Sequence, residues 1–377
     1  MLLVFASDSF KGSLSSKRIH ELLSNAAHDV LGECEIVCIP MADGGEGTLD
    51  AIVSVTGGEN VSYMVLDPLG RPIRSEYVVL PDGTAVVEMA KASGLTLLSE
   101  SERNPLLTST YGTGELIREA ISRGCKNITV TIGGSATNDG GMGCMKALGI
   151  RFLDEDGCEL DGCGADLEKV AHIDTSGLMP WTADIDFTVM CDVTNPLCGE
   201  NGATYTFGPQ KGADLDMMKR LEAGMKNYRD VIKREFNIDL DTIPGAGAAG
   251  GLGAALMVFL NGKLKSGIDT LLDLTDFDDR IKDADLIITG EGCADAQSSH
   301  GKVMQGIGLR AHKQGIPVIG ICGSIEKGAS DLYDQGISFL YETKPDDMPL
   351  QEAMINAEEL YLQTAKKVFT DQLSPLS

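Results

Sequence analysis

The chain has 377 residues, of which 43% are hydrophobic and 23% are charged, and its formal net charge is −25. This length is enough for two domains with full cores, and the negative charge disfavours binding to nucleic acid or anionic membranes. No apolar run is long enough to span a membrane, and we interpret the apolar start "MLLVFAS" as a strand and not as a signal peptide, because no basic segment precedes it.

The first part of the chain alternates between strand and helix patterns. Leu2–Ala6 is a short apolar run that predicts a strand, and Ser13–Leu31 carries an apolar stripe at helical spacing. A second strand at Cys34–Met41 and a second helix at Thr48–Val55 follow. This β-α-β-α series is typical of a parallel sheet covered by helices.

The middle of the chain has a different pattern. Ile73–Leu80 and Ala85–Met89 flank the turn "PDGT" and predict an antiparallel hairpin, and Arg151–Asp154 with Cys158–Leu160 predicts another. Further elements are expected as helices at Glu115–Arg123 and Met217–Phe236 and as strands at Ile128–Ile132 and Phe187–Cys191. We therefore expect a mixed α+β arrangement here.

The last hundred residues return to the alternating pattern. Strands are expected at Ala284–Thr289, Ile316–Cys322 and Ile337–Glu342, with a helix at Gly301–Gln314 and a long closing helix at Leu350–Phe369. The sequence thus predicts an α/β protein whose flavodoxin- or Rossmann-like parallel-sheet domain is formed by residues 1–65 and 281–377. A mixed α+β domain of residues 66–280 is inserted, and we expect the active site in the cleft between the two.

Cysteine and histidine usage restricts the chemistry. Ten cysteines are scattered without a C-x-x-C motif, which favours reduced thiols and a cytoplasmic location. The five histidines are equally dispersed, so a zinc site is not expected. We expect small-molecule substrates and neither a nucleic acid nor a membrane as partner; the sequence is compatible with a homo-oligomer.

Several predicted strands are followed by loops rich in acids, glycines and small polar residues. In parallel sheets, ligands bind outside the carboxyl ends of the strands, where such loops lie. In the loop "GGSATNDGG", Gly133 and Gly134 let backbone N–H groups face an anion, and Ser135 adds a hydroxyl, which suits phosphate. The alternative is a helix N-cap cluster in which Asn138 or Asp139 caps the following helix.

A second glycine-rich stretch, "PGAGAAGGLGAAL", contains a G-x-G-x-x-G match at Gly245, Gly247 and Gly250. A dinucleotide fingerprint requires a hydrophobic strand directly before the match, and the preceding "FNIDLDTIP" is polar. This disfavours a nicotinamide-dependent oxidoreductase. Gly250 and Gly251 remain candidates for contact with a nucleotide, or for close packing of the helix expected at Leu252–Leu260.

Charged side chains in these loops are the candidate catalytic groups. Asp43, Asp192 and Glu291 each follow a predicted strand, and carboxylates converging there suit Mg²⁺ binding, general-base catalysis or helix capping. The lysines of "FKG", "QKG" and "HGK", which are Lys11, Lys211 and Lys302, stand in glycine-rich surroundings and are candidate phosphate ligands.

These stretches together resemble the bacterial class I glycerate kinases. The resemblance rests on "SDSFKGSLS", "ADGGEGT", "NPLLTSTYGTGELI", "IGGSATNDGGMG", "CDVTNPLCGENGAT", "FGPQKGA", "PGAGAAGGLGAAL" and "DADLIITGEG", in the family's order over nearly the whole chain. It implies ATP-dependent phosphorylation of D-glycerate with Mg²⁺, most often to 2-phosphoglycerate. It also implies a flavodoxin-like domain with an inserted domain.

The family's motif residues are matched at Asp8, Lys11, Asp43, Gly133, Gly134, Ser135, Asp192, Asn195, Lys211 and Glu291. By chemistry, we assign Asp192 as general base and Lys11 and Lys211 as the cations that neutralise the transferring phosphoryl group. Asp43 and Glu291 would hold Mg²⁺, and the turn at 133–135 would cradle phosphate. Substrate or phosphate contacts are also expected from Asn138, Gly250, Gly251, Asp295 and Lys302.

One position departs from the family pattern. The late loop is usually G-E-G-R, and here "GEGC" places Cys293 at the position of the arginine. Cysteine lacks the bidentate guanidinium fork, so affinity or substrate choice is expected to change. The alternative functions are therefore a kinase for a related hydroxy acid and a non-catalytic hydroxy-acid sensor with the same fold.

Overall fold

The structure is a computed structural model that describes residues 1–41, 48–296, 298 and 302–373. The chain folds into two compact units. The first unit holds the described residues of Met1–Asp43, Asp50–Thr56 and Gly267–Ser377, and the second those of Gly44–Leu49 and Gly57–Ser266. Within the described ranges, no helix is long and apolar enough to cross a membrane.

The first unit is built on a five-stranded sheet in the order β15-β13-β11-β1-β2, and every pairing in it is parallel. The strands are β1 (Leu2–Ser7), β2 (Glu35–Cys38), β11 (Leu286–Gly290), β13 (Val318–Cys322) and β15 (Phe339–Glu342). Taken as five successive strands, their order is 2-1-3-4-5, which is the flavodoxin-like order. The predicted parallel-sheet fold is confirmed.

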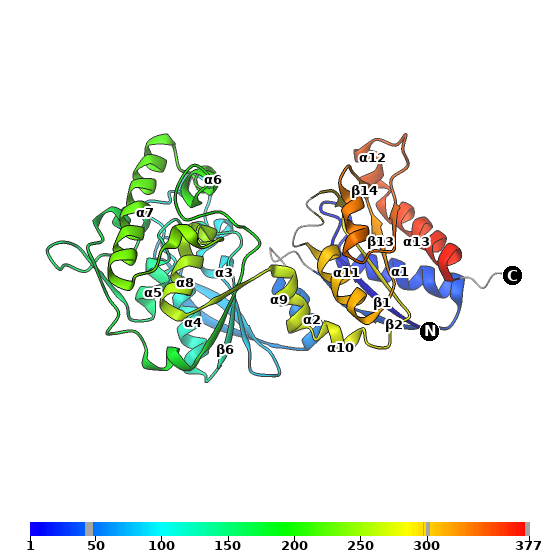
Figure 1. The fold of residues 1–377 in the computed structure, drawn as a ribbon, viewed down its shortest axis with the longest axis horizontal. Helices are drawn as coiled ribbons and strands as arrows, with labels where there is room; N and C mark the ends of the chain where they lie inside the picture. The colour runs from blue at the N-terminus through cyan, green and yellow to red at the C-terminus, as the bar shows by residue number, and fades with distance from the viewer. Residues whose placement is uncertain (42–47, 297, 299–301, 374–377) are drawn as a thin grey trace. The chain divides into compact units, whose positions relative to one another are not determined.

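Helices cover both faces of this sheet. Figure 1 shows α1 (Ser16–Leu31) and α13 (Ala357–Leu373) side by side on one face, with α11 (Val303–Gln314) on the other. The fully buried side chains of Phe5, Ile19 and Tyr361 belong to the core between the sheet and the first pair of helices. The other helices of this unit are α9 (Gly267–Leu274), α10 (Phe277–Arg280), α12 (Leu350–Ile355) and, from Asp50 onward, α2 (Thr48–Thr56).

The second unit has a six-stranded mixed sheet in the order β10-β9-β6-β5-β4-β3. Its strands are β3 (Glu59–Leu66), β4 (Pro72–Val79), β5 (Ala85–Glu88), β6 (Asn127–Thr131), β9 (Asp186–Met190) and β10 (Lys263–Lys265). The pairs from β5 to β10 are parallel, and β3, β4 and β5 are antiparallel. This confirms both the predicted hairpin around "PDGT" and the mixed character of the unit.

The helices of the second unit pack on this sheet around one large core. They are α3 (Ala90–Ser93), α4 (Tyr111–Ser122), α5 (Met142–Ala147), α6 (Ala203–Phe207), α7 (Leu215–Phe236) and α8 (Leu252–Leu260). Two short strands, β7 (Arg151–Leu153) and β8 (His172–Asp174), pair separately. The second predicted hairpin is present only in part, because Leu153 and Glu159 form an isolated bridge while the ladder partner of β7 is β8.

The predicted closing helix differs from the observed one. It is divided at Asn356 into α12 and α13. The Asn356 backbone has φ −95° and ψ 14°, outside the helical range, so α12 ends there before α13 begins. The break gives α12 a direction of its own, and α12 forms one wall of a cavity in the first unit.

Candidate functional site

A cavity of about 390 Å³ lies in the first unit. Its lining includes Asp8 and Lys11 after β1, Glu291 and Cys293 after β11, and residues that follow β13 and β15. It therefore occupies the carboxyl edge of the parallel sheet. Strands β1 and β11 are neighbours whose following connections run to opposite sides of the sheet, and this switch point is where open α/β sheets bind ligands.

The loop after β1 is held in place by backbone and ring contacts. The Asp8 N–H donates to the Gly290 carbonyl at 2.9 Å, which ties the loop to the end of β11. The Asp8 carboxylate is buried and accepts the Ser9 N–H at 2.6 Å. The Phe10 ring contacts Tyr361 edge-on, with centroids 5.4 Å apart, while Lys11 is exposed at the tip. The loop thus presents an acid and a lysine on a rigid base.

Glu291 is the acid with the most unusual surroundings. Its Oε1 is buried and has no hydrogen-bond partner in the part of the chain that the structure describes. Burial raises the pKa of Glu291, and the charges of Asp8 and Asp295 add to this; a hydrogen bond from Ser298 and the charge of Lys302 oppose it. A carboxylate oxygen without a partner beside a cavity is suited to receive a cation or a donor from a ligand.

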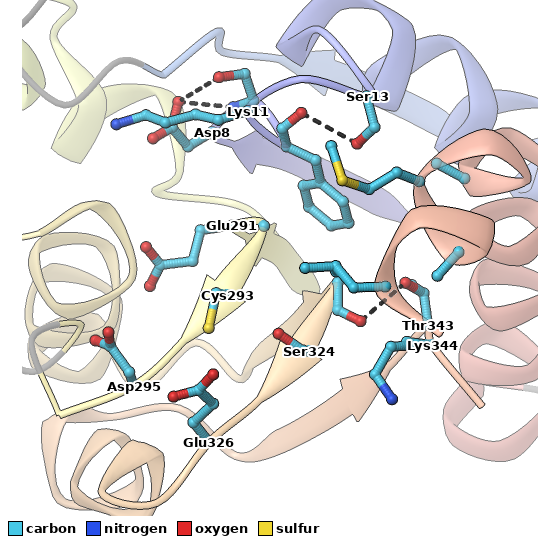
Figure 2. Close-up of a pocket in the computed structure, with 18 of the residues that line it drawn as sticks. Asp8, Lys11, Ser13, Glu291, Cys293, Asp295, Ser324, Glu326, Thr343 and Lys344 are labelled. Atoms are coloured by element: carbon cyan, nitrogen blue, oxygen red, sulfur yellow. Dashed lines mark hydrogen bonds between the residues drawn. The ribbon is translucent and has the colours of Figure 1, made fainter. Parts of the chain in front are cut away.

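Two short strands beyond the ends of β11 and β13 also contribute to the lining of the cavity. They are β12 (Cys293–Ala294) and β14 (Ser324–Ile325), which form a separate two-stranded parallel sheet and place Cys293 beside Ser324. Figure 2 shows Glu291, Cys293, Asp295 and Glu326 at one end of the cavity. Burial raises the pKa of the Cys293 thiol, the Ser324 hydrogen bond lowers it, and the charges of Glu326 and Asp295 raise it further.

The chemistry of these donors fits a hard divalent cation. Carboxylate oxygens are the ligands that Mg²⁺ prefers, and Glu291 offers one that nothing described occupies. Among the described residues, no group of three or more His, Cys, Asp or Glu side chains is arranged to hold a metal. The second predicted magnesium ligand, Asp43, lies outside the described residues. Glu291 can therefore supply one ligand, and substrate oxygens or water would complete the set.

The other predicted site residues belong to the second unit, and the turn after β6 is one group of them. Gly133 and Gly134 are exposed, and Gly134 has φ +73°. Ser135 is buried and forms an isolated bridge with Gly94, and the Gly134 carbonyl accepts the Leu95 N–H at 2.9 Å. Two exposed glycine backbones beside a hydroxyl remain compatible with the predicted anion contact.

The continuation of this loop is fully buried. Asn138 donates to the Thr204 hydroxyl at 3.1 Å. Asp139 accepts from the Thr110 N–H at 2.8 Å and from the N–H groups of Gly141 and Gly143, so it caps the start of α5. Burial raises the pKa of Asp139, and these hydrogen bonds oppose the rise. The capping alternative is thus realised by Asp139.

The glycine-rich stretch before α8 packs on the same loop. The Gly140 N–H donates to the Gly250 carbonyl at 2.9 Å. A Cβ atom on Gly250 would overlap the Thr137 carbonyl oxygen, and one on Gly251 would lie 2.7 Å from the Gly140 Cα. Both glycines have positive φ, +65° and +95°. Close backbone packing, the second of the two interpretations, explains why glycine stands at both positions.

The remaining predicted residues differ in accessibility. Lys211 is 2% exposed, and its ammonium donates to the Thr137 carbonyl at 2.6 Å. Burial lowers the pKa of Lys211 to about 7, against the opposing charge of Asp139. Asp192 is exposed after β9. Asn195 donates to the Asn201 carbonyl at 2.8 Å and so supports the loop before α6.

The structure thus brings five predicted residues to one cavity, namely Asp8, Lys11, Glu291, Asp295 and Lys302. Sequence reasoning missed several of its other lining residues, including Phe10, Glu326 and Met354. The residues of α12 were predicted only as the start of a long closing helix at Leu350–Phe369, without a role in a site. Only the fold shows that α12 borders a cavity.

The family model, the similar sequences and a similar crystal structure all relate this chain to glycerate kinases. The model of the glycerate kinase family matches residues 3–372. The chain is 43% identical to a glycerate kinase of Bacillus subtilis and 42% identical to a glycerate 2-kinase of Escherichia coli, in each case over 98% of this chain and 97% of the relative. A crystal structure of a putative glycerate kinase 2 from Salmonella typhimurium is similar, with a TM-score of 0.85 and 41% identity over 98% of this chain and 97% of that one.

Proposed function

Because the chain belongs to the glycerate kinase family and is therefore a kinase, we propose that it transfers the γ-phosphoryl group of ATP to D-glycerate with the help of Mg²⁺ and forms 2-phosphoglycerate. The observation that carries the proposal is the cavity at the switch point, where the unpartnered oxygen of Glu291 lies in the same lining as Lys11 and Lys302. The printed name of the Escherichia coli relative, glycerate 2-kinase, supports the regiochemistry.

The charges of this cavity suit phosphoryl transfer. The reaction needs little covalent help from the protein and depends on positioning and on neutralising the phosphoryl oxygens. Lys11, Lys302 and Glu291 all line the cavity. The proposed role of the two lysines is to supply positive charge, and that of Glu291 is to supply a ligand for Mg²⁺. When bound next to Glu291, Mg²⁺ would supply positive charge that offsets the negative charge of the phosphoryl group. Asp43 is proposed as a further ligand from the sequence resemblance alone.

The residues of the second unit have separate proposed roles. Asp192 is the proposed general base for the glycerate hydroxyl, and its exposure leaves it accessible to a substrate. The exposed backbone of Gly133 and Gly134 is proposed to contact a phosphate or carboxylate. For Lys211, a role in neutralising phosphate requires the ammonium to leave its buried contact with Thr137. Lys11 and Lys302 are therefore the stronger candidates.

The test is an ADP-release assay on the purified protein with ATP, Mg²⁺ and D-glycerate, with ³¹P NMR to identify the product. L-Glycerate, glycolate and lactate are the control acceptors. We expect turnover with D-glycerate and a 2-phosphoglycerate signal. Turnover only with another acid would support the alternative of a related hydroxy-acid kinase, and binding of D-glycerate without ADP release would support the sensor. Either result would overturn the proposal.

A further inference from the structure

One wall of the cavity has no part in the phosphoryl chemistry. Leu350, Ala353 and Met354 of α12 and Ala357 at the start of α13 all line it. Their spacing of i, i+3, i+4 and i+7 is that of a single apolar helical face, although the helix breaks at Asn356. Such a face normally packs only against a core, but here it also borders a cavity.

The wall is accessible as well as apolar. Leu350 is 64% exposed and Met354 is 37% exposed, whereas Ala353 is buried and Ala357 packs partly on the core, so the accessible part of the face is formed by the two larger side chains. Phe10 completes the apolar lining from the loop after β1 and is anchored from behind by Tyr361. Exposed apolar side chains that gather in a concave site are typical of a ligand surface.

The opposite end of the cavity is polar. Figure 2 shows Glu291, Asp295 and Glu326 there, away from Thr343 and Lys344, which lie toward the segment that leads into α12. Lys302 and Val303, at the N-terminus of the twelve-residue helix α11, also line the cavity. The positive end of a helix dipole beside a lysine favours an anion. The cavity thus has an apolar end and an end suited to phosphate with a metal ion.

A cavity with one apolar end and one polar end suits one of the two proposed substrates, ATP and glycerate, better than the other. Every carbon of glycerate carries a hydroxyl or carboxylate group, so glycerate has no apolar surface to bury against such a wall. Adenine has two flat apolar faces, and the rest of ATP is polar and anionic. A volume of about 390 Å³ lies in the range of small-molecule sites. The apolar wall can therefore bury the faces of an adenine ring, whereas glycerate offers no apolar surface for it to contact.

We propose that the apolar wall formed by Phe10, Leu350, Ala353, Met354 and Ala357 binds the adenosine part of ATP, so that the phosphates extend toward Glu291 and Lys302. This inference rests on the proposed function in taking ATP as the phosphoryl donor. It assigns nucleotide recognition to the first unit. It also makes Met354, through its accessible side chain, a residue that sets the affinity for ATP and not for glycerate.

The decisive variant is Met354→Glu in the full-length protein, with two companions. Met354→Leu keeps the wall apolar, and Ile355→Glu places the same charge on the neighbouring residue, which is 84% exposed and does not line the cavity. Binding of adenosine and of ADP is measured by NMR and by calorimetry, without glycerate. Adenosine is included because it reports on the wall alone, without the contribution of phosphate and metal.

We expect Met354→Glu to weaken ADP binding and raise the KM for ATP at least tenfold, and to abolish adenosine binding, because a carboxylate would have to be desolvated against the base. The KM for D-glycerate should stay within twofold. Met354→Leu and Ile355→Glu should behave like the wild type. Since Met354 is substantially exposed, the glutamate variant should fold, and circular dichroism checks this.

Unchanged ADP and adenosine binding in Met354→Glu would overturn the inference while leaving the kinase activity as proposed. A rise in the KM for D-glycerate with an unchanged KM for ATP would overturn it too, because the wall would then serve the acceptor. If the wild type binds ADP through Met354 but does not phosphorylate D-glycerate, the inference stands and the proposed acceptor is wrong. The experiment can therefore refute adenosine binding at the apolar wall without refuting D-glycerate phosphorylation, and the reverse.

Discussion

The loops after β11 and β6 have similar compositions but different surroundings. After β11, Glu291 has a buried carboxylate oxygen without a partner among the described residues, beside a cavity. After β6, the Asp139 carboxylate accepts hydrogen bonds from Thr110, Gly141 and Gly143 and is fully buried. The first loop has hydrogen-bonding capacity left for a ligand, and the second uses its acid to hold the protein together.

The difference shows how an acid- and glycine-rich loop should be interpreted. Acids after a strand can serve a ligand, and they can equally satisfy the free N–H groups at the start of a helix. Glycines can open the backbone to an anion, and they can allow two backbones to touch, as Gly250 does with Thr137. The feature that separates the two cases is an unsatisfied polar atom beside a cavity, which requires the fold to be known.

The largest effect is expected where backbone packing is tightest, at Gly250. Gly250→Ala would place a Cβ against the Thr137 carbonyl at φ +65° and should lower the free energy of unfolding by about 3 kcal/mol or more. The control is Gly157→Ala, at φ +75° in a turn with nothing within 4 Å of the added atom. It should cost about 1 kcal/mol, the conformational strain alone. Urea unfolding measures both, and equal losses would contradict the packing role.

The next effect concerns catalysis by Glu291 in the loop after β11. Glu291→Gln removes the charge but keeps the shape, and we expect kcat to fall about 100-fold, since the loss of one preorganised electrostatic contact typically has this size. The variant should also need more Mg²⁺ for half-maximal rate. Glu352→Gln, on the exposed part of α12, is the matched control and should retain the wild-type rate. Full activity of Glu291→Gln would show that the negative charge of Glu291 is not needed for catalysis.

A third effect is a pH dependence of stability due to Lys211. Because burial lowers the pKa of Lys211 to about 7 in the folded state, the unfolded chain binds more protons between pH 7 and the ordinary lysine pKa. Stability should therefore rise with pH in this window. Between pH 7 and 9 the gain should be about 2 kcal/mol. Urea unfolding of wild type and Lys211→Met at both pH values isolates this contribution, and a parallel response of the two proteins would refute it.

Much of the fold could be predicted because its signals are local. The strand–helix alternation at both ends and the D-G turn after β4 are short-range patterns, and the structure has each of them. Strand β3 was missed although its burial alternates, with Val61, Tyr63 and Val65 turned to the core and Ser62 exposed between them. Met64 is apolar but 57% exposed, so the sequence around it does not show the apolar–polar alternation that marks a strand.

The candidate site could be predicted only in part, for the same reason. Asp8, Lys11 and Glu291 follow strands, and parallel strands bring their carboxyl ends to one edge, so local patterns were enough to group them. The apolar wall depends on the position of α12, which the sequence does not specify. The stripe formed by Leu350, Ala353, Met354 and Ala357 has the same spacing as a core-facing stripe. Its function follows only from the cavity beside it.

The smallest effect is expected at Cys293, which the sequence resemblance marks as a departure from the family pattern. Its thiol lies among the charges of Asp295 and Glu326 at the polar end of the cavity. Cys293→Arg would add a cation between these acids and reduce the negative potential that an incoming nucleotide meets. We expect the KM for ATP to fall about fivefold at low ionic strength, with less change at high salt, because partly exposed charges are screened.

Steady-state kinetics with ATP as the varied substrate measures this change. Cys158→Arg, at an exposed position of the second unit, adds the same charge outside the cavity and should leave the KM for ATP unaltered. Cys293→Lys carries the charge without the bidentate fork, so it should give a smaller fall than arginine. If Cys293→Arg instead lowers the KM for D-glycerate and not that for ATP, the polar end of the cavity receives the acceptor. The loop after β11 would then bind D-glycerate and not the nucleotide.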